Sequence, residues 1–228
     1  MTIDKFISEL ASVENSDSMN NPYRNELQRE NLKLYLGYFI ENPPDCLFVG
    51  EAPGHNGCLH TGIAFTDEYR FIKEKARYKP LANFDENNVI LQNRRNPHEE
   101  KSAGIIWPAL KENDFFPLLW NIVPFYTHKP GKSECIHEPG EKSGNNRTPT
   151  AAEITIHWHF INDVLELFST IKFICAVGET SFNGLERYKD LIKRPIYPEY
   201  IPHPANRRGI KPNEKIKEVA ELLRRKNK

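Results

Sequence analysis

The sequence predicts an α/β protein, and its apolar runs carry that prediction. Four short runs read as strands buried on both faces, at 47–49, 118–125, 171–177 and 196–201. Glycine follows the runs at 47–49 and 171–177, and Pro202 with the His-Pro pair follows the run at 196–201; such residues typically end a strand. Segments of helical character separate the runs, and strands that alternate with helices form a parallel sheet covered on both faces.

Helices are expected before the first strand and between the later ones. These segments lie at about 2–14, 25–42, 151–167 and 181–188. Pro43 and Pro44 end the second helix just before the first strand, because proline has no amide hydrogen to continue the helical pattern.

One domain is expected to account for residues 1–228. The hydrophobic fraction of 39%, with 11% aromatic residues, is enough for one sizeable core. We expect N-terminal helices within 1–45, a charged insertion at 67–117 between the first and second strands, and a basic C-terminal helix at 209–228. Residues 128–146 read as a long exposed loop.

Composition argues against several classes of protein. No run approaches the roughly 18 apolar residues of a membrane-spanning helix, and the acidic N-terminal stretch does not resemble a secretory signal. We therefore expect a soluble, cytoplasmic protein with no membrane partner. The four cysteines form no CxxC pair, which in such a compartment predicts free thiols. The formal net charge is zero, so no global field favours nucleic acid, although lysine and arginine outnumber glutamate over 203–228.

The loops after the strands carry unusual polar chemistry. In parallel sheets, ligands bind beyond the carboxyl ends of the strands. The first strand leads into GEAPG (50–54), the third into VGETS (177–181) and the fourth into PHPANRR (202–208). Gly54 and Gly178 would let a ligand approach the backbone closely. A binding site is expected at this edge.

Five motifs occur in a familiar order: GEAPG with TGIAFT, then WNIVPF, NNRTPTAAEI, AVGETSFNGL and PHPANRRG. Together they resemble the uracil-DNA glycosylase superfamily over about 47–208. The resemblance implies a three-layer α/β/α sandwich around a four-stranded parallel sheet. It also implies hydrolysis of the N-glycosidic bond of uracil in DNA, leaving an abasic site, with no lyase step and no cofactor or metal. The partner would be DNA containing a deaminated base, and we expect a monomer.

Such a reaction needs groups on both sides of the bond that breaks, once the base has been flipped into a pocket. Glu51 is the candidate that positions water and stabilises the sugar cation. His203, as a neutral imidazole, is the candidate donor to the uracil carbonyl. Some branches of the family have Asp or Asn where this chain has Ala52, and that departure moves the role to Glu51. Asp67 and Glu68 are fallback carboxylates.

The base itself would be held by an aromatic ring, an amide and the backbone. Phe65 is the candidate floor on which the base stacks. Asn121 resembles the family's base-reading asparagine, whose amide offers a donor and an acceptor that match uracil and fit cytosine poorly. Gly50, Ala52 and Gly54 belong to the loop whose backbone N–H groups are expected to hold base or phosphate oxygens.

Contacts with DNA are expected after the catalytic histidine. Asn206, Arg207 and Arg208 follow His203 where the family places its DNA-intruding loop, although a solvated basic turn is the alternative. Arg147 of the NRTPT element is assigned to DNA as well, with a structural role equally open.

No metal centre is expected. Some branches with the same motifs hold an iron-sulfur cluster through four cysteines, but Phe125 (or a neighbour) and His157 stand in two of those places and the N-terminal pair is missing. The pairs Cys58/His60 and Cys135/His137 have zinc-like spacing, but nothing in the sequence brings the two loops together.

Two alternatives remain open. Ala52 and the insertion at 67–117 could reshape the pocket for another deaminated base, such as hypoxanthine or xanthine. The missing acid at position 52 and the neutral overall charge instead fit a catalytically silent DNA-binding member of the same fold.

Overall fold

The computed structural model describes residues 1–82, 84, 96–130, 145–204 and 211–226, and it confirms the predicted α/β class. Its central sheet has three parallel strands: β2 (Cys46–Gly50), β3 (Leu118–Asn121) and β5 (Phe173–Ala176). Their order is β3-β2-β5, so β2, which comes first along the chain, lies in the middle of the sheet. Every residue of these strands is buried, as strands covered on both faces require.

The register of the sheet brings two loops together. Gly50, the last residue of β2, pairs with Asn121, the last residue of β3. The chain after Asn121 then folds over the exit of β2, because the N–H of Ile122 donates to the Gly50 carbonyl and that of Val123 to the Glu51 carbonyl. The run at 118–125 is therefore a strand only as far as Asn121.

The fourth expected strand, at 196–201, is interrupted. Parallel bridges join Ile174 to Ile196 and Val177 to Ile201, one at each end of the segment. Pro198 lies between them and has no N–H to offer a neighbouring strand. In the described part of the chain the sheet thus has three continuous strands and an edge segment that pairs only at its two ends.

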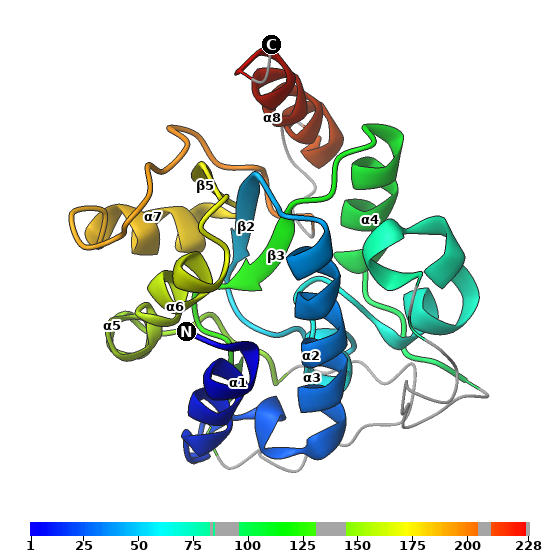
Figure 1. Ribbon diagram of the computed structural model, residues 1–228. Helices are drawn as coiled ribbons and strands as arrows, with labels where there is room; N and C mark the ends of the chain where they lie inside the picture. Colours follow the sequence, from blue (N-terminus) through cyan, green and yellow to red (C-terminus); the bar gives the residue numbers. More distant parts are fainter. Residues whose placement is uncertain (83, 85–95, 131–144, 205–210, 227–228) are drawn as a thin grey trace.

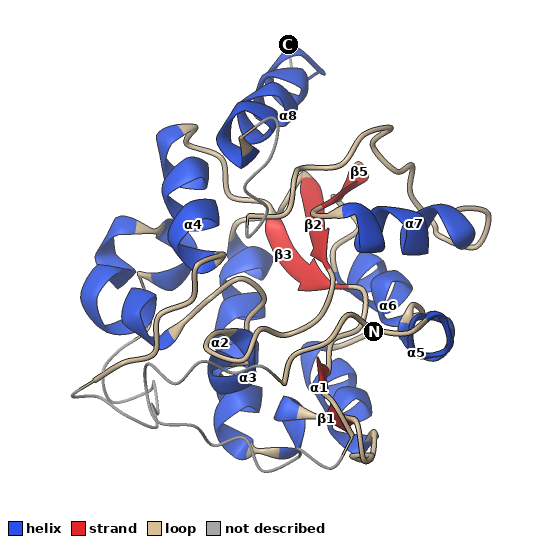
Figure 2. Ribbon diagram, turned by 180° about the vertical axis from the view of Figure 1, so that it is seen from behind, coloured by secondary structure: helices blue, strands red, loops and turns tan. Residues whose placement is uncertain are grey.

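Helices surround the strands (Figures 1 and 2). The α-helices are α1 (Ile3–Ser12), α2 (Glu26–Glu41), α3 (Cys58–Thr61), α4 (Ala103–Glu112), α5 (Ala151–His157), α6 (Phe160–Leu167), α7 (Glu179–Arg187) and α8 (Pro212–Lys226). The short elements are the antiparallel pair β1 (Met19–Asn20) and β4 (Tyr126–Thr127), the 3-10 turns η1 (Pro22–Arg24), η3 (Lys75–Arg77) and η4 (Lys79–Leu81), and the π-helical turn η2 (Arg70–Glu74).

The helix expected at 151–167 is in fact two helices. After α5 the hydrogen bonding tightens, because the N–H of Ile161 donates to the carbonyl three residues earlier, at Trp158. The Trp158 ring stacks on Tyr188 at the end of α7, with 4.9 Å between centroids and 5° between planes. The break at Trp158 and His159 lets α6 take its own direction.

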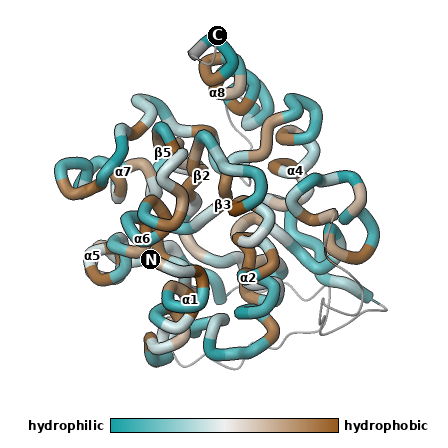
Figure 3. The backbone as a smooth tube through the Cα atoms, in the orientation of Figure 1, coloured by the Kyte–Doolittle hydropathy of each residue, from teal (hydrophilic) through white to brown (hydrophobic). Residues whose placement is uncertain are grey.

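The core is aromatic and includes the insertion. Trp120 of β3 contacts Phe6 of α1 with 5.4 Å between ring centroids. Phe71 and Trp107, both within 67–117, are buried in the same hydrophobic core. Figure 3 shows the hydrophobic residues concentrated on β2 and β3 at the centre. Burying each such side chain contributes about 2–3 kcal/mol.

Two further features of the described residues bear on the expectations from sequence. Cys46, Cys58 and Cys175 are buried free thiols, as predicted. In the described ranges, no helix combines the length and the apolar character needed to cross a membrane.

Candidate active site

A cavity of about 340 Å3 opens at the carboxyl ends of β2 and β3. It brings together residues from well-separated segments of the chain, which are Glu51, Ala52, Pro53, Gly54, Phe65, Glu100, Ser102, Asn121, Thr127, Asn146, Arg147, Thr148, Pro149 and His203. Most of the residues selected from the sequence, namely Glu51, Ala52, Gly54, Phe65, Asn121, Arg147 and His203, therefore line one cavity.

Gly50 does not line the cavity but makes room for two residues that do. A Cβ atom at Gly50 would lie 2.3 Å from Cζ of Phe65 and 2.7 Å from Oδ1 of Asn121. Both distances are far inside van der Waals contact. A glycine at the end of β2 is therefore what allows the ring and the amide to meet there.

The backbone of Phe65 has a conformation that is unfavourable for any residue with a Cβ atom. Its φ angle is +54°, in the left-handed region, which costs roughly 1–2 kcal/mol for a residue with a Cβ. The hydroxyl of Thr61 fixes the turn, because it donates to the carbonyl of Thr66 at 2.8 Å and accepts from the N–H of Ile63. Strain of this kind persists only where the surroundings impose it. The ring is thus a rigid part of the cavity wall.

Asn121 presents a nearly buried amide to the cavity. The residue is 4% exposed, and Nδ2 lies 4.0 Å from Sγ of Cys58, a weak contact at the limit of hydrogen bonding. Within the described ranges the amide has no other hydrogen-bond partner. Its donor and acceptor capacity is therefore available to a ligand.

Glu51 and His203 face the same cavity from different loops. Burial lowers the pKa of His203, the charge of Glu51 opposes that shift, and Lys101 adds to it. The imidazole is accordingly neutral near pH 7, as the sequence analysis required. Among the described residues, the Glu51 carboxylate accepts no hydrogen bond, while its backbone is fixed by the N–H of Val123. It is free to hold a water molecule.

The fallback carboxylates do not line the cavity. Asp67 is fully buried, where its Oδ2 accepts from the guanidinium of Arg70 and from the N–H of Glu100, each at 2.7 Å. Glu68 accepts from the N–H of His98 at 3.0 Å and contacts its ring Nδ1 at 2.5 Å. Both carboxylates attach the segment 98–100 to the turn that carries Phe65.

The same attachment brings Glu100 to the cavity, a residue that the sequence did not single out. The Glu100 carboxyl lines the cavity and occupies the space above two glycines of the GEAPGHNG loop. A Cβ at Gly54 would lie 1.7 Å from its Oε1, and one at Gly57 2.2 Å from its Oε2. Burial raises the pKa of Glu100 to about 8, Asp67 adds to the shift, and Arg70 opposes it. The glycines were the only signal, since Glu100 itself lies in no motif.

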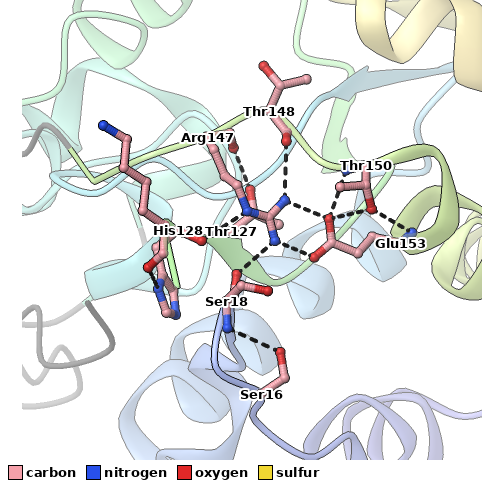
Figure 4. Close-up of polar contacts among 9 residues, drawn as sticks. Ser16, Ser18, Thr127, His128, Arg147, Thr148, Thr150 and Glu153 are labelled. Atoms are coloured by element: carbon pink, nitrogen blue, oxygen red, sulfur yellow. Dashed lines mark hydrogen bonds and ion pairs between the residues drawn. The ribbon is translucent and has the colours of Figure 1, made fainter. Parts of the chain in front are cut away.

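Arg147 is bound within the protein at every donor (Figure 4). Its Nε donates to the carbonyl of His128, and Nη2 donates to that of Ser18. Both terminal nitrogens also bind the Glu153 carboxylate, at 2.7 and 2.5 Å, and Nη1 reaches the carbonyl of Thr148. A guanidinium has five N–H groups, and these contacts use all of them.

Glu153 also caps a helix, in addition to forming this ion pair. It forms a capping box with Thr150 at the start of α5, in which each side chain bonds the other residue's backbone N–H. Burial favours the neutral acid, but the hydrogen bonds from Arg147 and Thr150 outweigh it and lower the pKa of Glu153 to about 2.

The positions considered for metals have other surroundings. Phe125 and His157 pack edge to face, with 4.8 Å between ring centroids. Cys58 is buried, and His60 stacks on His98 at 4.1 Å. Across the described ranges, no group of three His, Cys, Asp or Glu side chains has a metal-binding arrangement. Cys135 and His137 lie outside the described residues, as do Asn206, Arg207 and Arg208.

Comparisons with known proteins bear on the family and the fold of this chain. The family model described as the uracil DNA glycosylase superfamily matches residues 37–224. No match was found among curated protein sequences. Among solved structures, the chain is similar to the crystal structure of wild-type SMUG2 from Pedobacter heparinus, with a TM-score of 0.63 and 17% identity. That similarity covers 99% of this chain and 97% of the other.

Proposed function

This chain belongs to the uracil DNA glycosylase superfamily and is a DNA glycosylase by family, and on that premise we propose that it removes uracil from DNA. The product would be an abasic site. The observation that carries the proposal is the single cavity lined by Glu51, Phe65, Asn121 and His203. These are the residue types that the reaction needs on the sugar, on the face of the base and on its edge.

Recognition would come first. A base inside a duplex must be flipped out before an enzyme can reach its glycosidic bond. The flipped uracil would stack on Phe65 while the Asn121 amide donates to one carbonyl oxygen and accepts from the ring N–H. Cytosine offers the amide an amino donor and an unprotonated ring nitrogen instead. A buried polar site rejects such a mismatch because its own groups are left unpaired.

Bond cleavage would follow by attack of water. As the C1′–N1 bond breaks, its electron pair leaves with the base, and positive charge develops on the sugar. Glu51 would stabilise that charge and accept the proton of the water whose oxygen bonds to C1′. His203 would donate a hydrogen bond to the carbonyl oxygen on which the negative charge of the base collects. We propose a monofunctional reaction, in which water and not a lysine amine attacks C1′.

The remaining assignments extend the proposal beyond the cavity. We assign Asn206, Arg207 and Arg208 to DNA contact, on the sequence alone. For Arg147 the internal bonding favours the structural role over the DNA role. A single domain over 1–228, a monomeric state and a cytoplasmic location complete the proposal.

A second substrate class has one observation in its favour. Glu100 adds a polar group to the cavity wall beyond those that reading uracil through Asn121 requires. Hypoxanthine and xanthine, the deaminated purines, have additional acceptor atoms that such a group could bind. A silent binder is the remaining alternative, since Ala52 brings no acid.

The test is a panel of labelled duplex and single-stranded oligonucleotides, each with one uracil, hypoxanthine or xanthine. Purified protein is incubated with each, and alkali then breaks the strand at any abasic site. We expect breaks at uracil, in the single-stranded or U·G substrate. Breaks confined to the purine substrates would replace uracil with that class. DNA binding without any breaks would support the silent binder.

A further inference from the structure

The Glu100 carboxyl is a built part of the cavity and not a surface charge that happens to lie near it. Its backbone N–H donates to Oδ2 of Asp67 at 2.7 Å, and Asp67 is itself fully buried. Two residues earlier, the backbone and ring of His98 bind Glu68. The segment is thus attached at two points to the turn that carries Phe65.

The loop opposite accommodates this carboxyl. Any side chain at Gly54 or Gly57 would overlap its oxygens, at 1.7 and 2.2 Å from the Cβ positions. In the described chain the carboxyl oxygens form no hydrogen bond with the protein. A polar group that is held in place, turned to a cavity and unbonded there has its hydrogen-bonding capacity available for what enters the cavity.

The cavity contains two carboxyl groups in different surroundings. Glu51 interacts electrostatically with His203, whereas Glu100 is influenced by the negative charge of Asp67 and the positive charge of Arg70. Glu100 also acts electrostatically on the Cys58 thiol, which is buried. Two carboxyl groups whose environments differ in this way can take an acid role and a base role in one site.

We propose that Glu100 donates a hydrogen bond from its neutral carboxyl to an oxo acceptor of the flipped base, and so helps to select deaminated bases. This inference rests on the proposed function. Deamination replaces an amino donor by an oxo acceptor, so a donor in the wall favours the deaminated base over its parent. Ionised Glu100 would lose that donor and would repel the base as it leaves with negative charge.

An alkaline limit of activity follows. Because burial raises the pKa of Glu100 to about 8, the neutral form predominates near pH 7 and is lost as the pH rises through 8. For the wild type we expect kcat/KM for excision to fall about tenfold per pH unit above that value. In Glu100→Gln the amide donates at every pH, so the decline should move up by at least about one pH unit.

The experiment measures excision kinetics from pH 6 to 10 for the wild type, Glu100→Gln and Glu99→Gln. Glu99 is an exposed neighbour outside the cavity, so its substitution should leave the profile unchanged. Gly54→Ala gives a second test without altering Glu100, since the new methyl group must displace the carboxyl. We expect its kcat/KM at pH 7 to fall about tenfold. An identical alkaline limb in the wild type and Glu100→Gln would overturn the inference.

A titration that does not depend on turnover separates this inference from the proposed function. The side-chain carboxyl carbon of glutamate is labelled with 13C, and the Glu100 signal is identified by its loss in Glu100→Gln. We expect that signal to titrate near pH 8 and to move when free uracil or hypoxanthine is added. Titration near pH 4.5 would refute the inference even if excision occurs, whereas an inactive protein with the expected titration would refute only the proposed function.

Discussion

At the residue scale, the cavity is formed from side chains that are fixed before a ligand arrives. Thr61 holds the turn in which Phe65 takes its positive φ angle, and Gly50 leaves the space that Phe65 and Asn121 fill. Groups that are already oriented need no reorganisation as charge develops, which is why they stabilise a transition state more than water does. On the proposed function, the flipped base would enter the cavity with little rearrangement of its walls.

Substitution of the two catalytic candidates should separate catalysis from binding. Glu51→Gln should lower kcat by about 100-fold to 10,000-fold, because the amide cannot accept a proton from water. His203→Ala should cost about 100-fold to 1,000-fold through loss of the donor. Single-turnover excision measures both, fluorescence anisotropy checks that DNA binding persists, and Glu99→Gln is the matched control. Activity unchanged in both variants would remove these residues from the mechanism.

Gly50 offers a test of close packing. In Gly50→Ala the new methyl group would overlap the Phe65 ring, so the ring or the strand end must move. Overpacking of this kind costs about 1–3 kcal/mol, and a displaced ring would no longer support the base. Urea unfolding and KM for the oligonucleotide report the two effects. Wild-type stability with wild-type KM would show that the space beside Gly50 is not required.

At the scale of elements, Arg147 joins three parts of the chain. Its guanidinium links the carbonyls of Ser18, before β1, and of His128, after β4, to Glu153 in the first turn of α5. The same residue lines the cavity. The arrangement explains why an NRTPT motif can shape the cavity without contacting a ligand through its arginine.

Arg147→Lys tests that explanation. Lysine keeps the positive charge but cannot reproduce the planar fork that binds Glu153 through two nitrogens. We expect a loss of about 2–3 kcal/mol in the free energy of unfolding, because buried acceptors lose their donors. DNA affinity should change by less than about threefold. A large loss of DNA affinity at unchanged stability would instead return Arg147 to the DNA interface.

At the scale of the whole molecule, buried titratable groups make stability depend on pH. Burial lowers the pKa of His157 to about 4, and its ring packs against Phe125 and Phe160 in the core. An unfolded histidine has a pKa near 6.5, so between pH 6.5 and 4 the unfolded chain binds more protons than the folded one. Stability must therefore fall as the pH drops through this window.

The contribution of His157 can be isolated by substitution. Between pH 7 and 5 we expect it to account for a decrease of roughly 2 kcal/mol in the free energy of unfolding. His157→Phe should reduce that decrease, because phenylalanine keeps the aromatic packing and takes up no proton. Urea denaturation at both pH values measures the difference. An equal decrease in the two proteins would place the pH dependence elsewhere.

Local patterns were sufficient for the fold class and for the three continuous strands, whereas the candidate residues of the cavity came from the resemblance of the motifs to a known family. Apolar runs such as 47–49 must be buried whatever surrounds them, and turn residues such as Gly54 act within a few positions. Local patterns did not predict the interruption at Pro198 or the division of 151–167 into α5 and α6. Both depend on how a segment meets its neighbours.

For the cavity too, the sequence indicated some of the residues, and only the tertiary structure brought in the others. The resemblance of the motifs selected Glu51, Phe65, Asn121 and His203. Three of them, Glu51, Asn121 and His203, lie at or just after the ends of strands or strand-like runs, and parallel strands end at the same edge of a sheet. The arrival of Glu100 over Gly54, the internal bonding of Arg147 and the burial of Asp67 and Glu68 follow from packing between segments far apart in the chain. Contacts of this kind have no period or spacing in the sequence, because the distance between the partners along the chain is arbitrary.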